Sequence, residues 1–176
     1  QGFGRRSMAL SQHELSCDLH YQIAALCGMA SIQGLNVDYV KPHGALYNDM
    51  MADEIILSTV LDAISHFPVP LKLMMLATNQ AEKHTELAQS KGVNLLFEAF
   101  ADRRYTDAGT LTPRSQAGSV LNKKQMLAQV EQLVNEGTVT TDTNKVIALR
   151  ADTLCVHGDN LEGIAAIKEI RALCHR

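Results

Sequence analysis

The chain has 176 residues, a formal net charge of −3 and 46% hydrophobic residues, an ordinary composition for a globular domain with a real core. A charge this close to neutral argues against nucleic acid or an acidic membrane surface as a partner, because either would favour a basic face. No apolar run approaches the ~20 residues of a membrane-spanning helix. The sequence therefore predicts a single domain over residues 1–176.

Four cysteines are spread along the chain: Cys17, Cys27, Cys155 and Cys174. They show no CxxC pairing and no clustering typical of a metal site. We expect them to be reduced and mostly buried, as in a cytoplasmic protein.

The first half of the chain alternates helical patterns with short apolar runs. Residues 11–33 are predicted to form a helix, because Ser11 and Glu14 have the spacing of a capping box. A β-branched strand is predicted over 37–40 and a second helix over about 51–66. The positions predicted to face inward are Leu15, Leu19, Ile23, Leu26 and Ala30 in the first helix, and Ile55, Ile56, Val60, Leu61 and Ile64 in the second.

The second half of the chain continues this alternation. The further predicted elements are strands at 71–77, 93–100 and 153–158 and helices at about 79–91, 123–136 and 160–174. Parallel neighbours need a crossover of a dozen or more residues, so the alternation predicts an α/β fold with a mostly parallel sheet. Two segments interrupt it: 111–119 reads as a long loop, and 139–149 reads as a hairpin.

Ionisable side chains follow three of the predicted strands. They are Lys41 and His43 after the first strand, Asp102 and Arg103 after the third, and His157 and Asp159 after the last. In parallel α/β proteins the carboxyl ends of the strands meet at one rim, where ligands bind. Any one of these residues could equally be a loop or cap residue, so the predicted shared site depends on their coincidence.

The residues predicted for the rim offer two kinds of chemistry. Lys41, Arg103 and Arg114 could hold a carboxylate or a phosphate, and Gly44 would leave room for a ligand. The candidate general bases, or ligands of a divalent ion, are His43, Asp102, His157 and Asp159. Of the adjacent Arg103 and Arg104, we expect only one to point inward. The sequence contains no GxxxxGK[ST] phosphate loop.

Three segments resemble, in this order, the signature segments of the LamB/YcsF family, the family of the 5-oxoprolinase A subunits. They are VKPHGALYN at 40–48, FADRRYTDAGTLTPRSQAGSVL at 100–121 and TLCVHGDN at 153–160. The resemblance implies a distorted parallel β/α barrel, similar to that of polysaccharide deacetylases. It also implies the ATP-dependent opening of 5-oxoproline (pyroglutamate), a small-molecule substrate, to L-glutamate together with two other subunits.

Family members carry a further N-terminal segment that supplies the first barrel strands. We therefore expect this chain to be N-terminally truncated and to span roughly the C-terminal two-thirds of the barrel. An incomplete barrel exposes unpaired strand edges, so assembly with copies of the same chain is an alternative way to cover them.

The resemblance maps the KPHG segment to Lys41–Gly44, the FADR segment to Phe100–Arg103, the PRS segment to Pro113–Ser115 and the HGD segment to His157–Asp159. It implies that Lys41, with Arg103 or Arg114, binds the carboxylate or phosphoryl group. Water activation would fall to Asp102, Asp159, His43 or His157.

Two other functions stay open. One is a metal-dependent deacetylase acting on a carbohydrate amide, with His43, His157 and Asp159 around one divalent ion. The other is a subunit that binds its partners without a catalytic role.

Overall fold

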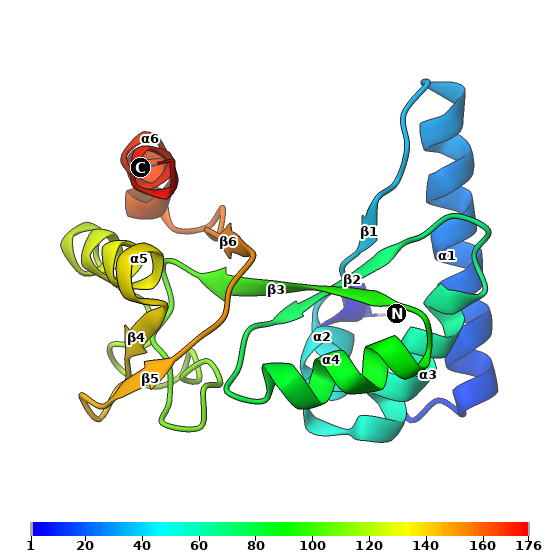
Figure 1. The fold of residues 1–176 in the computed structure, drawn as a ribbon, viewed down its shortest axis with the longest axis horizontal. Helices are drawn as coiled ribbons and strands as arrows, with labels where there is room; N and C mark the ends of the chain where they lie inside the picture. Colours follow the sequence, from blue (N-terminus) through cyan, green and yellow to red (C-terminus); the bar gives the residue numbers. More distant parts are fainter. Residues whose placement is uncertain (1, 176) are drawn as a thin grey trace. The chain divides into compact units, whose positions relative to one another are not determined.

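The structure is a computed structural model that describes residues 2–175. It is a mixed α/β fold in which the chain forms two compact units (Figure 1). The first unit comprises Gln1–Met75 and Glu82–Leu96, and the second comprises Leu76–Ala81 and Phe97–Arg176. The single domain over 1–176 stays a prediction. No helix among residues 2–175 is both long enough and apolar enough to cross a membrane.

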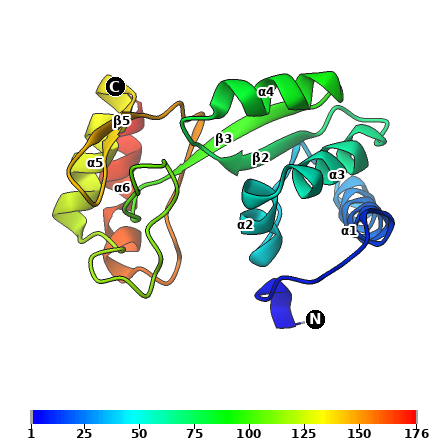
Figure 2. The same ribbon diagram turned by 90° about the horizontal axis from the view of Figure 1, so that it is seen from below.

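The first unit contains most of the helices that precede the candidate site. Its elements are a 3-10 turn (Gly2–Gly4), α1 (Gln12–Ile32), β1 (Tyr39–Val40), α2 (Ala45–Ala52), α3 (Glu54–Ser65), and most of β2 (Lys72–Leu76) and of α4 (Ala81–Ser90). Strand β1 pairs in parallel with β2, with Val40 opposite Leu73. Helix α4 covers one side of β2, and α2 and α3 cover the other (Figure 2). This two-sided cover explains why β2 is a near-continuous apolar run.

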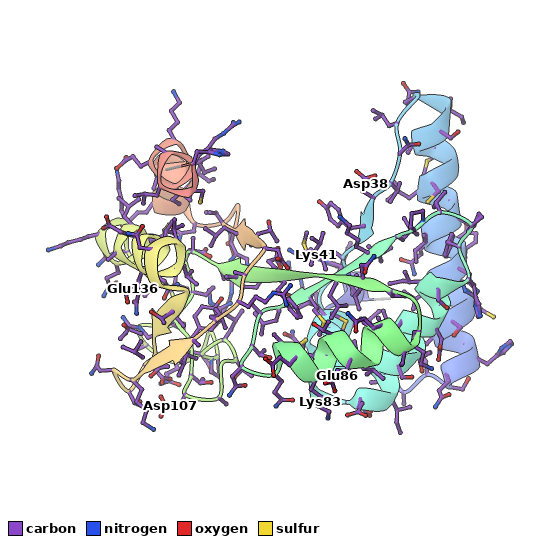
Figure 3. All side chains as sticks on the ribbon, in the orientation of Figure 1. Asp38, Lys41, Lys83, Glu86, Asp107 and Glu136 are labelled. Carbon is purple, nitrogen blue, oxygen red and sulfur yellow. The ribbon has the colours of Figure 1, made fainter. Side chains whose placement is uncertain are left out.

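The second unit carries the end of β3 (Asn94–Phe100) and everything that follows it. Its elements are α5 (Lys123–Glu136), β4 (Thr138–Thr140), β5 (Val146–Ala148), β6 (Thr153–Cys155) and α6 (Leu161–Cys174). Strands β4 and β5 form the predicted antiparallel hairpin, with Asp107 beside it (Figure 3). Helices α5 and α6 share an apolar core made by Ala101, Leu121, Met126, Val130, Ala166 and Ile170.

The strand order of the sheet is β1-β2-β3-β6. Strand β3 pairs in parallel with β6, with Phe100 opposite Cys155. The predicted parallel sheet is confirmed, whereas its closure into a barrel stays a prediction.

The predicted capping box of α1 is confirmed. Ser11 and Glu14 bond reciprocally at the start of α1, through the Glu14 amide at 3.2 Å and the Ser11 amide at 2.9 Å. Asn122 and Gln125 form a second capping box at the start of α5. Gly137 ends α5 in the left-handed conformation at φ 64°, which costs glycine little because it has no Cβ.

The helix predicted over about 51–66 is wrong in its start. Residues 45–52 form a separate helix, α2, and Asp53 interrupts the helical path with extended backbone angles of φ −130° and ψ 114°. The Asp53 carboxylate then accepts a hydrogen bond from the Ile55 amide at 2.8 Å and caps α3. The predicted helix therefore corresponds to α3, and α2 is a further helix that the sequence did not predict.

Several burial predictions are also wrong. Leu26 and Ile55 were expected to face inward, but they are 56% and 60% exposed. Cys17 and Cys174 are exposed, although cysteines are expected to be mostly buried. The apolar face of each of these helices is wider than the part that packs against the core. Periodicity alone does not show which residues of that face remain exposed to solvent.

Candidate functional site

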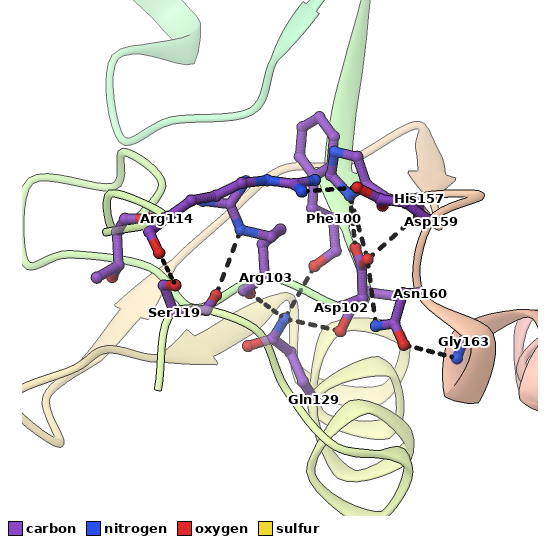
Figure 4. Close-up of polar contacts among 12 residues, drawn as sticks. Phe100, Asp102, Arg103, Arg114, Ser119, Gln129, His157, Asp159, Asn160 and Gly163 are labelled. Atoms are coloured by element: carbon purple, nitrogen blue, oxygen red, sulfur yellow. Dashed lines mark hydrogen bonds and ion pairs between the residues drawn. The ribbon is translucent and has the colours of Figure 1, made fainter. Parts of the chain in front are cut away.

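The centre of the candidate site is a pair formed by Asp102 and His157. The Asp102 side chain is 1% exposed and follows the end of β3, and His157 follows β6. The His157 Nδ1 lies 3.0 Å from Oδ1 and 3.1 Å from Oδ2 of Asp102 (Figure 4). The His157 backbone amide also donates to Oδ2 at 3.3 Å. Two of the predicted general bases are therefore in direct contact.

The ionisation of Asp102 determines which ring nitrogen of His157 carries the hydrogen. Burial by itself raises the pKa of Asp102, but hydrogen bonds from His157 and Asn160, with the attraction of the His157 ring, outweigh burial and lower it. An ionised carboxylate only accepts hydrogen bonds, so His157 must donate from Nδ1. Neutral His157 then presents Nε2 as a proton acceptor. Its ring stacks on Phe100 with centroids 5.2 Å apart, which limits rotation.

The backbone that carries Asp102 is held by a glutamine from α5. Gln129 is 7% exposed, and its Nε2 donates to the carbonyl oxygens of Phe100 at 2.9 Å, Ala101 at 3.2 Å and Arg103 at 2.9 Å. These carbonyls flank Asp102 on both sides. The Gln129 amide therefore holds the turn after β3 where the sheet can no longer supply hydrogen bonds.

Arg103 and Arg114 have different surroundings. Arg103 is buried and donates to the carbonyl oxygens of Thr112 at 2.6 Å and Ser119 at 3.3 Å, so it holds the 111–119 loop. Arg104 is half-buried, so Arg103 is the more buried of the two adjacent arginines. The part of Arg103 in substrate binding stays a prediction.

Arg114 forms an exposed ion pair with Asp159. Its NH1 atom lies 2.8 Å from Asp159 Oδ2, and the two side chains are 48% and 65% exposed. The hydrogen bond from Arg114 lowers the pKa of Asp159, and the same bond raises the pKa of Arg114. An exposed pair of this kind contributes little to stability, so an anionic ligand can compete with Asp159 for the guanidinium.

A cleft of about 510 Å³ lies beside these residues. Its walls combine a buried carboxylate, an arginine and the amino ends of α5 and α6. The lining residues are Asp102, Arg114, Val120, Leu121, Asn122, Asp159, Asn160, Leu161 and Glu162. The cleft thus carries charges of both signs beside apolar side chains.

Lys41, His43 and Gly44 belong to the first unit. Lys41 and His43 are exposed, and the Lys41 Nζ lies 5.8 Å from the centre of the Tyr47 ring. Gly44 has φ 64°, and a Cβ there would lie 2.2 Å from the carbonyl oxygen of Gly4. Close approach of the Gly4 backbone therefore explains this glycine. The roles of Lys41, His43 and Gly44 in a shared site stay predictions.

A metal centre gains no support from the geometry. Among residues 2–175, no group of three His, Cys, Asp or Glu side chains is placed to hold a metal ion. The set of His43, His157 and Asp159 around one ion stays a prediction.

Gln129 and Asn160 were not predicted from the sequence. A glutamine in the middle of a helix is usually a surface residue, and no local pattern marks Gln129 as buried. Asn160 has a recognisable signal, since an asparagine directly before an apolar helical run is a typical N-cap. Its Nδ2 also lies 3.5 Å from Asp102 Oδ2.

Comparison with known proteins identifies the family. The LamB/YcsF family profile matches residues 1–176. The 5-oxoprolinase A subunit of Vibrio campbellii is 48% identical over 172 residues, which are 97% of this chain and 68% of that protein. A 5-oxoprolinase A subunit of Pseudomonas putida is 47% identical over 97% of this chain and 66% of that protein.

A solved structure is similar over nearly the whole chain. The crystal structure of the lactam utilization protein from Thermus thermophilus superposes with a TM-score of 0.87 at 35% identity. The match covers 99% of this chain and 70% of the other. This chain is a member of the LamB/YcsF family.

Proposed function

We propose that this chain is a subunit of an ATP-dependent 5-oxoprolinase, which opens 5-oxoproline to L-glutamate together with two other subunits. The observation that carries the proposal is the contact between Asp102 and His157 beside a cleft that Asp102 and Arg114 both line. The names of the relatives, which are 5-oxoprolinase A subunits and a lactam utilization protein, support a cyclic amide as the substrate.

The chemistry requires a base and an acid at the ring amide. Water must bond to the ring carbonyl carbon, the C–N bond must break, and the ring nitrogen must take up a proton to leave as an amine. His157 Nε2 would accept a proton from the attacking water and return it to the nitrogen. Asp102 would hold the His157 imidazole in place and stabilise its protonated form, because the carboxylate contacts Nδ1.

The substrate also carries a carboxylate that requires a cation. Arg114 lies in the same cleft and can form two parallel hydrogen bonds to a carboxylate. Asp159 would leave the guanidinium when the substrate binds, which is a small cost for an exposed pair.

ATP would enter through the complex. Phosphorylation of the amide oxygen would make the ring carbon easier to attack. After water adds and the C–N bond breaks, the phosphoryl group would stay on the new carboxyl as an acyl phosphate, and a second water would release phosphate and leave L-glutamate. Since this sequence lacks a GxxxxGK[ST] loop, we attribute the phosphorylation to the partner subunits. We also propose that the complete fold is a distorted β/α barrel and that the protein acts in the cytoplasm.

The test is glutamate and phosphate release from 5-oxoproline and ATP. We expect release when this chain is combined with its two partner subunits, and none when this chain is left out. The exposed histidine of α1 provides a control: His13→Gln should retain activity and His157→Gln should lose it. Full activity with His157→Gln would favour a non-catalytic subunit. Hydrolysis of acetylated sugars without ATP would favour the deacetylase.

A further inference from the structure

Asn160 lies at a junction between the candidate site and helix α6. Its Oδ1 accepts a hydrogen bond from the Gly163 amide at 3.1 Å and caps the helix. Its Nδ2 lies 3.5 Å from Asp102 Oδ2 (Figure 4). The two contacts determine how the side-chain amide is oriented, because the backbone N–H requires an acceptor and the carboxylate requires a donor. One side chain thus joins a helix end to the buried carboxylate.

The neighbouring residues favour this geometry. A Cβ at Gly163 would lie 2.7 Å from Val156 Cγ1 and 3.4 Å from Asn160 Cγ, so only glycine lets the first turn of α6 come this close. The Asn160 backbone amide also donates to the His157 carbonyl at 3.2 Å. The turn that carries His157 is therefore held against α6, with the Asn160 side chain directed at Asp102.

We propose that Asn160 is a positioning residue, which holds the Asp102 carboxylate in the orientation that accepts a hydrogen bond from His157 Nδ1. Oδ2 of Asp102 accepts from the His157 amide and faces Asn160 Nδ2, while both carboxylate oxygens face His157 Nδ1. Without Asn160 the carboxylate is restrained from one side only and can turn about its last bond. The kinetic consequence rests on the proposed function, whereas the structural one does not.

Two substitutions separate the helix cap from the contact with Asp102. Asn160→Ser keeps a good N-cap but removes the Nδ2 donor. Asn160→Asp keeps the cap and the shape of the side chain, but it replaces the Nδ2 donor with an oxygen of a second carboxylate, which faces the carboxylate of Asp102. Asn144→Asp is the matched control, because it adds the same charge in the exposed turn of the β4–β5 hairpin.

The structural readout is the nitrogen NMR spectrum of His157 at one constant pH, with the signals assigned from their loss in His157→Gln. We expect the Nδ1–H signal to weaken in Asn160→Ser and to weaken further in Asn160→Asp, and to stay unchanged in Asn144→Asp. In the assembled complex, kcat for 5-oxoproline should fall about tenfold in Asn160→Ser and on the order of a hundredfold in Asn160→Asp. KM should stay within about a factor of two, since the residue acts through Asp102.

An unchanged His157 spectrum in a folded Asn160→Ser variant would overturn the positioning role, and the serine variant suffices if the aspartate variant does not fold. A tenfold rise in KM at constant kcat would also overturn it, because Asn160 would then bind substrate directly. If the spectrum changes while the wild-type complex releases no glutamate, the positioning role is supported and the proposed function fails.

Discussion

His157 Nδ1 lies 3.0 Å from the carboxylate of Asp102, although the two residues are 55 positions apart in the chain. The register of the sheet explains the contact. Phe100 of β3 is opposite Cys155 of β6 in a parallel pair, and Asp102 and His157 each follow two residues later. Equal offsets on paired parallel strands bring the two side chains together at the carboxyl end of the sheet, where α/β proteins bind ligands.

Arg114→Gln should raise KM for 5-oxoproline about tenfold and leave kcat nearly unchanged, because a carboxylate contact contributes equally to substrate and transition state. The measurement is the dependence of glutamate release on substrate concentration. Arg171→Gln, at an exposed position of α6, is the matched control and should change neither constant. Loss of kcat at unchanged KM would mean that Arg114 acts on the reacting centre rather than on the substrate carboxylate.

Gln129→Met should destabilise the fold by about 2 kcal/mol or more, because it leaves three carbonyl oxygens without their buried donor. Methionine has nearly the volume of glutamine, so the loss of packing is small. Urea unfolding gives the change in free energy. Gln22→Met, on the exposed face of α1, should stay within about 0.5 kcal/mol of the wild type. Equal effects of the two substitutions would contradict the role of Gln129.

The ionised Asp107 side chain should make the free energy of unfolding decrease at acid pH. Hydrogen bonds from Lys145, Thr141 and Thr143 lower its pKa to about 2, from an ordinary value of 3.8. Because the folded pKa lies below the unfolded one, the stabilisation is complete above about pH 4 and is lost as the pH falls through about 2. Asp107→Asn should therefore lose less stability than the wild type between pH 4 and pH 2. Parallel stability curves for the two proteins over that range would refute this contribution.

His84→Leu should stabilise the protein. His84 is 9% exposed, and its Nδ1 is buried without a hydrogen-bond partner. Burial, with a smaller effect of Lys83, lowers its pKa below the ordinary 6.5, so the unfolded chain takes up the proton first. Stability linked to His84 is complete above about pH 6.5 and declines below it. The leucine variant should gain about 1 kcal/mol at neutral pH and more at pH 5, measured by urea unfolding. A loss of stability at both pH values would show that the imidazole has a partner in solution.

The parts of the fold that depend on neighbouring residues could be predicted from the sequence. The capping box of α1 depends on two residues three positions apart, and this prediction is confirmed. The hairpin of β4 and β5 and the parallel order of the strands follow from local patterns and crossover lengths. Helix α2 was missed because Pro42 and Gly44 indicate a loop, whereas glycine at φ 64° is also a good residue immediately before a helix.

The parts that depend on distant residues could not be predicted in the same way. The strand pattern places Asp102 and His157 at one rim, but it cannot show that they touch, because contact depends on the exact register of β3 and β6. Gln129 and His84 lie on helical surfaces whose burial is decided by what packs against them. The residues that pack against them are distant in the sequence, so a pattern of neighbouring residues does not reveal their burial.

The central claim is that Asp102 and His157 activate the water that opens the lactam ring. The most direct test is glutamate release from 5-oxoproline and ATP by the assembled complex carrying Asp102→Asn. This change keeps the size of the side chain and removes its charge, so the complex should assemble while kcat falls at least about a hundredfold. A folded Asp102→Asn complex that releases glutamate within twofold of the wild-type rate would contradict the claim.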